Sequence, residues 1–260
     1  MPVTAIQYKL SGNYGQATLL VPKYSGKYKN NPLTRLLSPD ALATQFAQAF
    51  ERILARLGLP ADGIVVLVKF NDNGSEFAST TTLYNSDGEP IQLINFCINA
   101  FIKLYKFVTN IYEEVKHEAA HAVQRHWIGD NYESVPRWWR EGSALYAAWP
   151  QGDVRVLAHY AVKAYNLNDL VTGLKPKKFS MIDYPESYLA IKLIIERFGL
   201  EKVKEINLLL GEDNFDDVFP SAINMTMDEF SDAVREYAQK EMQTYEFVRF
   251  INLQIRKMRS

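Results

Sequence analysis

Two histidines four residues apart are the feature of this sequence best suited to chemistry. They belong to the pentapeptide His117-Glu118-Ala119-Ala120-His121. If this segment is helical, the two imidazoles lie about 40° apart around the helix axis and project side by side from one face. Two imidazoles in this arrangement can bind one metal ion, and the chain contains only 4 histidines. The spacing therefore predicts a metal site with His117 and His121 as ligands.

Glu118 lies between the two histidines and is not needed as a ligand. Zinc lowers the pKa of a bound water to about 7, and a carboxylate beside the metal can accept the proton as that water attacks a carbonyl carbon. The His-Glu-x-x-His pattern indicates zinc only where it lies on a helix. We therefore expect one zinc ion per chain, with Glu118 as the general base. The alternative is a surface helix with two solvated histidines.

A tetrahedral catalytic zinc needs a third protein ligand and a position left open to water. His126 is close in sequence, but a metzincin-type site requires glycine and histidine at the positions that Gln124 and Trp127 occupy. Glu141 comes 20 residues after His121, on a second predicted helix that could fold back to the metal. We predict Glu141 as the third ligand. The alternative is a solvated helix carboxylate.

Small residues follow Glu141 on the same predicted helix. Gly142 costs about 1 kcal/mol relative to alanine inside a helix, so we expect a packing reason for it. Close approach of another helix is one such reason, and Ala144, Ala147 and Ala148 extend the small surface.

The elements that must position these residues follow from turn signals and hydrophobic periodicity. Ser38-Pro39 is a helix start, and apolar residues at helical spacing predict a helix over 39–57. Short β-branched and apolar runs between turn residues predict strands at 63–70, 77–83 and 90–97. The pattern then becomes helical. The expected helices span about 102–127, 136–149, 153–165, 185–198, 200–210 and 226–257.

The order of these elements, strands first and helices afterwards, predicts an α+β protein. We expect two domains: residues 1–130 as an α+β lobe that includes the long helix with the histidines, and residues 131–260 as a helical lobe that carries Glu141. Residues 1–37 lack sustained periodicity, so we expect loops or short strands there, and their role is not predicted.

Composition limits the partners. The 30 acidic and 29 basic residues give a net charge of −1, so we expect neither nucleic acid nor a membrane as partner. No apolar run is long enough for a membrane span, and no secretory signal is visible, although a chain trimmed of its signal would look the same. The chain has 1 cysteine, Cys97, so any metal must bind to histidines and carboxylates. Compartment and oligomeric state are not predicted.

The residues around the predicted ligands resemble a known family. The family is the gluzincin-type zinc metallopeptidases, especially the peptidase-MA-like group related to aminopeptidase N and thermolysin. The similar residues are His117 to His121, followed by Pro136-x-Trp138-x-x-Glu141-Gly142-x-Ala144-x-Tyr146. The resemblance implies a zincin-like fold: a mixed N-terminal sheet whose edge strand lines the cleft, the long metal-binding helix and a helical C-terminal lobe. We expect Pro90–Cys97 to be the edge strand that pairs with an extended peptide.

A weaker resemblance covers Tyr184 to Gly199 and concerns a tyrosine. Residues 184–190 are similar to a helix start of aminopeptidase-N-type enzymes, in which a tyrosine hydroxyl stabilises the oxyanion of the tetrahedral intermediate. By this match Tyr184 is the candidate and Tyr188 the reserve, while the alternative is a tyrosine that only packs. Two family features are absent. They are a Gly-x-Met-x-Asn segment and the thermolysin-type aspartate, whose place Leu145 occupies.

These features together predict a zinc-dependent metallopeptidase that acts on a peptide or protein substrate. Two alternatives stay open: a catalytically silent zincin-like binding module, and a zinc hydrolase of a non-peptide amide or ester. Endo- or exopeptidase action is not predicted. We interpret Trp138 and Trp139 as packing residues. Arg137 and Arg140 are interpreted as solvated, or as bonded to a ligand side chain, more readily than as contacts for a substrate carboxylate.

Overall fold

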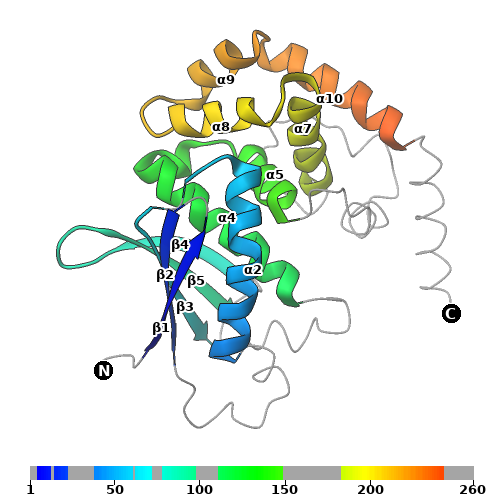
Figure 1. Cartoon of the computed structure of the whole chain (residues 1–260). Coiled ribbons are helices and arrows are strands. Elements are labelled where there is room, and N and C mark those ends of the chain that lie inside the picture. Colours follow the sequence, from blue (N-terminus) through cyan, green and yellow to red (C-terminus); the bar gives the residue numbers. More distant parts are fainter. Residues whose placement is uncertain are drawn as a thin grey trace, which may run out of the picture. The chain divides into compact units, whose positions relative to one another are not determined.

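The computed structural model describes residues 5–12, 15–22, 38–60, 62–71, 78–97, 111–148 and 183–242 (Figure 1). These residues contain 5 strands and 7 α-helices, so the protein is α+β, as predicted. The chain divides into two compact units, residues 1–129 and 130–260. The assignment of two domains with a boundary at residue 130 stays a prediction. None of the helices in the described ranges has the length and apolar content that a membrane span needs.

The first unit contains a mixed sheet with the strand order β1-β2-β3-β5-β4. β1 and β2 form an antiparallel hairpin, β2, β3 and β5 run parallel, and β4 returns antiparallel to β5. The strands are β1 (Ala5–Gly12), β2 (Gly15–Pro22), β3 (Ile64–Asn71), β4 (Ala78–Tyr84) and β5 (Pro90–Cys97). The N-terminal segment, whose role the sequence does not reveal, thus supplies two strands of the sheet.

The prediction that Pro90–Cys97 is the edge strand is wrong. β5 lies between β3 and β4, and β4 is the outermost described strand on that side. Burial gives the reason. Three consecutive residues of β5, at positions 92–94, are buried, as expected for a strand covered on both faces, whereas β4 alternates between half-buried and exposed residues. From the sequence, either β4 or β5 could have paired with β3, and only the burial of their residues distinguishes the two strands.

Helix α2 (Pro39–Leu57) connects the parallel strands β2 and β3, as a parallel pair requires. The backbone N–H of Ala41 donates to the hydroxyl of Ser38 at 3.2 Å, and Pro39 is the first helical residue. Gly58, with φ of 69°, ends the helix in the left-handed conformation. The predicted helix over 39–57 is confirmed.

Helix α4 (Ile111–Ile128) carries the pentapeptide with the two histidines. Val115, Ala119 and Ala122 on its apolar face are buried, and the helix contacts α2, β4 and β5. Near its end, the indole N–H of Trp127 donates to the carbonyl oxygen of Pro60 at 2.6 Å. The predicted start of this helix near residue 102 lies outside the described residues. Packing therefore holds the pentapeptide on a helix, as its use as a metal motif requires.

The second unit is helical in its described residues. A 3-10 segment, η1 (Gly129–Ser134), leads into it from the first unit. The helices are α5 (Arg137–Ala148), α7 (Asp183–Phe198), α8 (Leu200–Leu209), α9 (Phe215–Ile223) and α10 (Met227–Met242). The helix predicted at 153–165, and the end of the one predicted to reach 257, lie outside the described residues.

Aromatic side chains form the core beneath α5. The ring of Trp138 lies 5.5 Å from Phe219 and 5.8 Å from Phe230, and Phe215 stacks on Phe219 at 5.0 Å. The indole N–H of the adjacent Trp139 donates to a buried asparagine side chain at 3.0 Å. The two tryptophans are therefore packing residues, as interpreted from the sequence, and they anchor the first turns of α5.

Gly142 lies where α5 packs against α7. A Cβ atom at this position would overlap the backbone carbonyl oxygen of Ser187 and would also crowd the side chain of Ile191. The packing reason expected for Gly142 is thus confirmed as close contact between two helices. Glu141 lies next to Gly142 on α5, and Tyr184 lies one turn before Ser187 on α7. The two candidate residues therefore belong to helices that are tightly packed together.

Candidate metal centre

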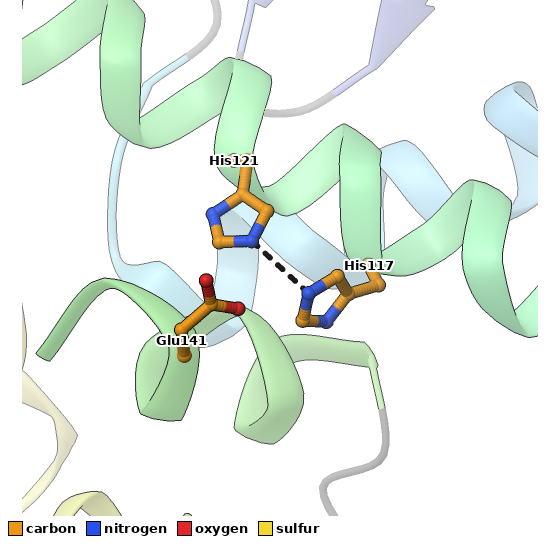
Figure 2. A group of neighbouring side chains, drawn as sticks. All are labelled: His117, His121 and Glu141. Carbon is orange, nitrogen blue, oxygen red and sulfur yellow. Dashed lines mark hydrogen bonds between the residues drawn. The ribbon is translucent and has the colours of Figure 1, made fainter. Parts of the chain in front are cut away.

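His117 and His121 face one another on α4 (Figure 2). Their Nε2 atoms lie 3.0 Å apart, and the ring planes are perpendicular, at 90°. In a tetrahedral site with Zn–N bonds of about 2.0–2.1 Å, two imidazole nitrogens lie about 3.3 Å apart. Without a metal, the observed separation of 3.0 Å fits an N–H···N hydrogen bond in which one ring donates and the other accepts. Both side chains are buried, so the alternative of two solvated histidines does not describe this helix.

Glu118 is bonded to strand β4 of the same unit. The hydroxyl of Thr80 donates to Oε2 of Glu118 at 2.5 Å, and it lies 3.2 Å from the carbonyl oxygen of Glu118. The side chain of Glu118 is buried, with 5% exposed. This carboxylate is therefore held in one orientation by a neutral donor. Sequence reasoning missed Thr80, because the pattern of the strand does not indicate which helix residue its hydroxyls meet.

Glu141 belongs to the second unit, one turn after Arg137 in α5. Nε of Arg137 donates to Oε1 of Glu141 at 3.2 Å, and the two side chains are 47% and 11% exposed. Nη2 of the same guanidinium lies 3.5 Å from the hydroxyl oxygen of Tyr184 on α7. A carboxylate this buried and this engaged does not match the alternative of a solvated helix position. One guanidinium thus joins the predicted third ligand to the predicted oxyanion tyrosine.

The surroundings of Arg137 also affect its pKa. Burial lowers the pKa of the guanidinium, but its interactions with Tyr184 and Glu141 outweigh the burial. The pKa of Arg137 is therefore raised, and the side chain is cationic at neutral pH.

The two candidate tyrosines differ in what surrounds them. Tyr188 is buried in a hydrophobic cluster with Leu145, Leu189 and Ala238. Tyr184 is half-buried at the margin of that cluster, and its hydroxyl faces Arg137. A hydroxyl that must meet a substrate oxygen needs access, so the surroundings favour Tyr184 over Tyr188 for that role.

Other residues singled out from the sequence have local, structural partners. Arg140 forms an ion pair with Glu133 at 2.7 Å and lies 4.9 Å over the ring of Tyr132, so it has no part in the candidate centre.

Burial lowers the pKa of His126, and a hydrogen bond with the backbone of Asp62 opposes this shift. His126 therefore fastens the end of α4 to the segment before β3. Cys97 is buried, as expected.

Comparison with known proteins gives fold-level similarities of low score. No family model matches the sequence, and a search of curated proteins found no match. The chain is similar to the M1 zinc metallopeptidase from Deinococcus radiodurans, with 12% identity and a TM-score of 0.49 over 92% of this chain and 51% of that chain. A mutant of a two-domain M1 zinc metallopeptidase bound to L-arginine gives 10% identity and a TM-score of 0.46 over 92% of this chain and 51% of that one.

A third similar structure is the aminopeptidase N family protein from Idiomarina loihiensis. It shows 12% identity and a TM-score of 0.35 over 91% of this chain and 41% of that chain. This chain therefore spans about half, or less, of the length of these proteins. Similarities of this size say nothing about activity, so a functional assignment has to come from the side chains.

Proposed function

We propose that this protein is a zinc-dependent metallopeptidase in which His117, His121 and Glu141 bind the metal. The observation that carries the proposal is the grouping of their ligand atoms: one from each side chain, all within 4.8 Å of one another (Figure 2). Two imidazoles and one carboxylate form a donor set used by catalytic zinc, with a further position left to water or substrate. The helical His-Glu-x-x-His spacing supports the same assignment.

The side chains around this donor set provide the remaining functions of a hydrolase. Zinc bound here would lower the pKa of a water and polarise a substrate carbonyl. Glu118, held by Thr80, accepts the proton of the attacking water and then donates it to the departing amine. Tyr184 donates a hydrogen bond to the carbonyl oxygen as negative charge develops on it. Arg137 orients both Glu141 and Tyr184 from their own unit.

A peptide or protein substrate is proposed because of the sequence resemblance to gluzincin peptidases around both ligand segments. Two alternatives remain as outcomes of the test. A catalytically silent binding module would show no hydrolysis that depends on Glu118. A hydrolase of non-peptide amides or esters would show such hydrolysis, but only in a screen of those compounds and not with peptides.

The deciding experiment is the metal content of protein purified without added metal, measured for the wild type, His121→Ala and Glu141→Ala. We expect about one zinc per chain in the wild type and a loss of zinc in both variants, since a catalytic zinc site has three protein ligands and the removal of one weakens binding. A peptide-library screen follows, with Glu118→Gln as the inactive control. A wild type that takes up no zinc even when zinc is added would overturn the enzyme assignment. Zinc retained by Glu141→Ala alone would exclude Glu141 as a ligand.

A further inference from the structure

We propose that Thr80 is the positioning residue of the general base. Its hydroxyl holds the Glu118 carboxylate through Oε2, so that Oε1 is the oxygen that exchanges protons with water and leaving group. This inference rests on the proposed function, in which Glu118 is the base, and it assigns a role to a strand residue that the sequence motif does not include.

The contact is short and joins two firmly held elements of the first unit. Thr80 lies in the middle of β4, where it pairs with the buried Ile94 of β5. Glu118 lies on α4, which contacts both strands. The Thr80 hydroxyl therefore comes from a sheet and not from a loop, and its position depends on the backbone pairing of two strands. It contacts both the side chain and the backbone of Glu118: it donates to Oε2 at 2.5 Å and lies 3.2 Å from the backbone carbonyl oxygen.

The distance is that of a strong hydrogen bond. Hydrogen bonds from a hydroxyl to an ionised carboxylate are typically about 2.5–2.7 Å long, shorter than bonds between neutral groups. The 2.5 Å separation lies in this range. A neutral donor orients the carboxylate without placing a full positive charge beside it.

Orientation matters because the side chain of Glu118 is long. A general base must come within about 2.6–3.2 Å of the proton-bearing atom, and a misplacement of about 1 Å can reduce the rate about 100-fold. Three rotatable side-chain bonds determine where this carboxylate lies. The Thr80 hydroxyl removes this freedom at one oxygen.

The neighbouring threonines of β4 show that the contact is specific to one position. Thr82 shares the face of Thr80, but its hydroxyl donates to the side chain of Gln92 at 3.0 Å. Thr81 is on the opposite face and is exposed. Thr81 therefore offers a matched control: the same residue type on the same strand, directed away from Glu118.

The test compares Thr80→Val, Thr80→Ser and the control Thr81→Val in the zinc-loaded protein, with a peptide identified by the library screen. We expect Thr80→Val to lower kcat about 10–100-fold with KM within about twofold and zinc content unchanged. Thr80→Ser keeps the hydroxyl and should stay within about threefold of the wild type, as should Thr81→Val. A Thr80→Val variant with wild-type kcat, or a Thr80→Ser variant as slow as the valine variant, would overturn the proposal.

A second measurement does not depend on zinc or on activity. Crystal structures of the wild type and of Thr80→Val should show Glu118 in one orientation in the first and in a different orientation, or in several, in the second. If Glu118 keeps its orientation in the valine variant, the positioning role is wrong whatever the activity. If its orientation changes but the wild type hydrolyses nothing, the proposed function fails while the positioning of Glu118 by Thr80 stands.

Discussion

The candidate ligands of the two units are held in different ways. His117 and His121 lie one turn apart on α4, and their convergence follows from helical geometry within a single element. Glu141 instead depends on its neighbours: Arg137 on its own helix and, through that guanidinium, Tyr184 on α7. The first arrangement forms wherever the helix forms. The second requires two helices packed as closely as Gly142 allows.

The two carboxylates differ in a parallel way. Both Glu118 and Glu141 are buried, but Glu118 accepts a hydrogen bond from a neutral hydroxyl, whereas Glu141 is paired with a guanidinium. A cation beside a carboxylate favours its ionised form, which suits a metal ligand. A neutral hydroxyl orients Glu118 without adding such a charge, which suits a base. The partners of the two residues thus match the two roles proposed for them.

The largest effect expected from this comparison concerns Glu118→Gln. The amide cannot accept a proton, and loss of a general base costs about 100–10,000-fold in rate. We therefore expect kcat to fall by this amount while zinc content and folding stay as in the wild type, since Glu118 is not a ligand. The assay is hydrolysis of a peptide together with elemental analysis. Loss of zinc from Glu118→Gln would show that both carboxylates serve the metal, and the distinction between them would fail.

A smaller effect is expected for Arg137→Gln, which removes the cation beside Glu141. Residues that orient a metal ligand typically contribute about 10–100-fold to metal affinity or activity, so we expect zinc affinity to fall by this factor. A competition titration with a chelator measures it. The matched control is Arg140→Gln, three residues later on α5, whose partners are Glu133 and Tyr132. Equal losses in the two variants would indicate a general effect of charge and not the orientation of Glu141.

The smallest effect on the candidate centre is expected for Gly142→Ala, which alters the helix contact and the stability of the fold without touching a candidate ligand. The added methyl group would overlap the carbonyl oxygen of Ser187, and overpacking of this kind costs about 1–3 kcal/mol. Urea unfolding should show a decrease of this size in the free energy of unfolding. The control is Ser143→Ala, a buried neighbour on the same helix where a hydroxyl is removed and no atom is added. A Gly142→Ala variant as stable as the wild type would mean that the two helices can move apart freely.

Local features of the sequence were sufficient for several elements of the fold. Helix α2 was predicted over its full length, because the cap at Ser38, the proline that follows it and the helical spacing of its apolar residues are all local signals. The order of β4 and β5 in the sheet was predicted wrongly. Both segments are short strands around one turn, and which of them meets β3 depends on burial by elements elsewhere in the chain.

For the candidate centre, the sequence by itself determined the facing of His117 and His121, because a spacing of four residues and the helical repeat are sufficient for it. It also indicated Glu141, by its place on a second predicted helix, and Tyr184, by resemblance, without the partners of either. Only the tertiary structure decided that Thr80 holds Glu118 and that Arg137 faces Tyr184. These pairs are 38 and 47 residues apart in the chain, so no local periodicity relates them. They meet because a strand packs on α4 and because α5 packs on α7.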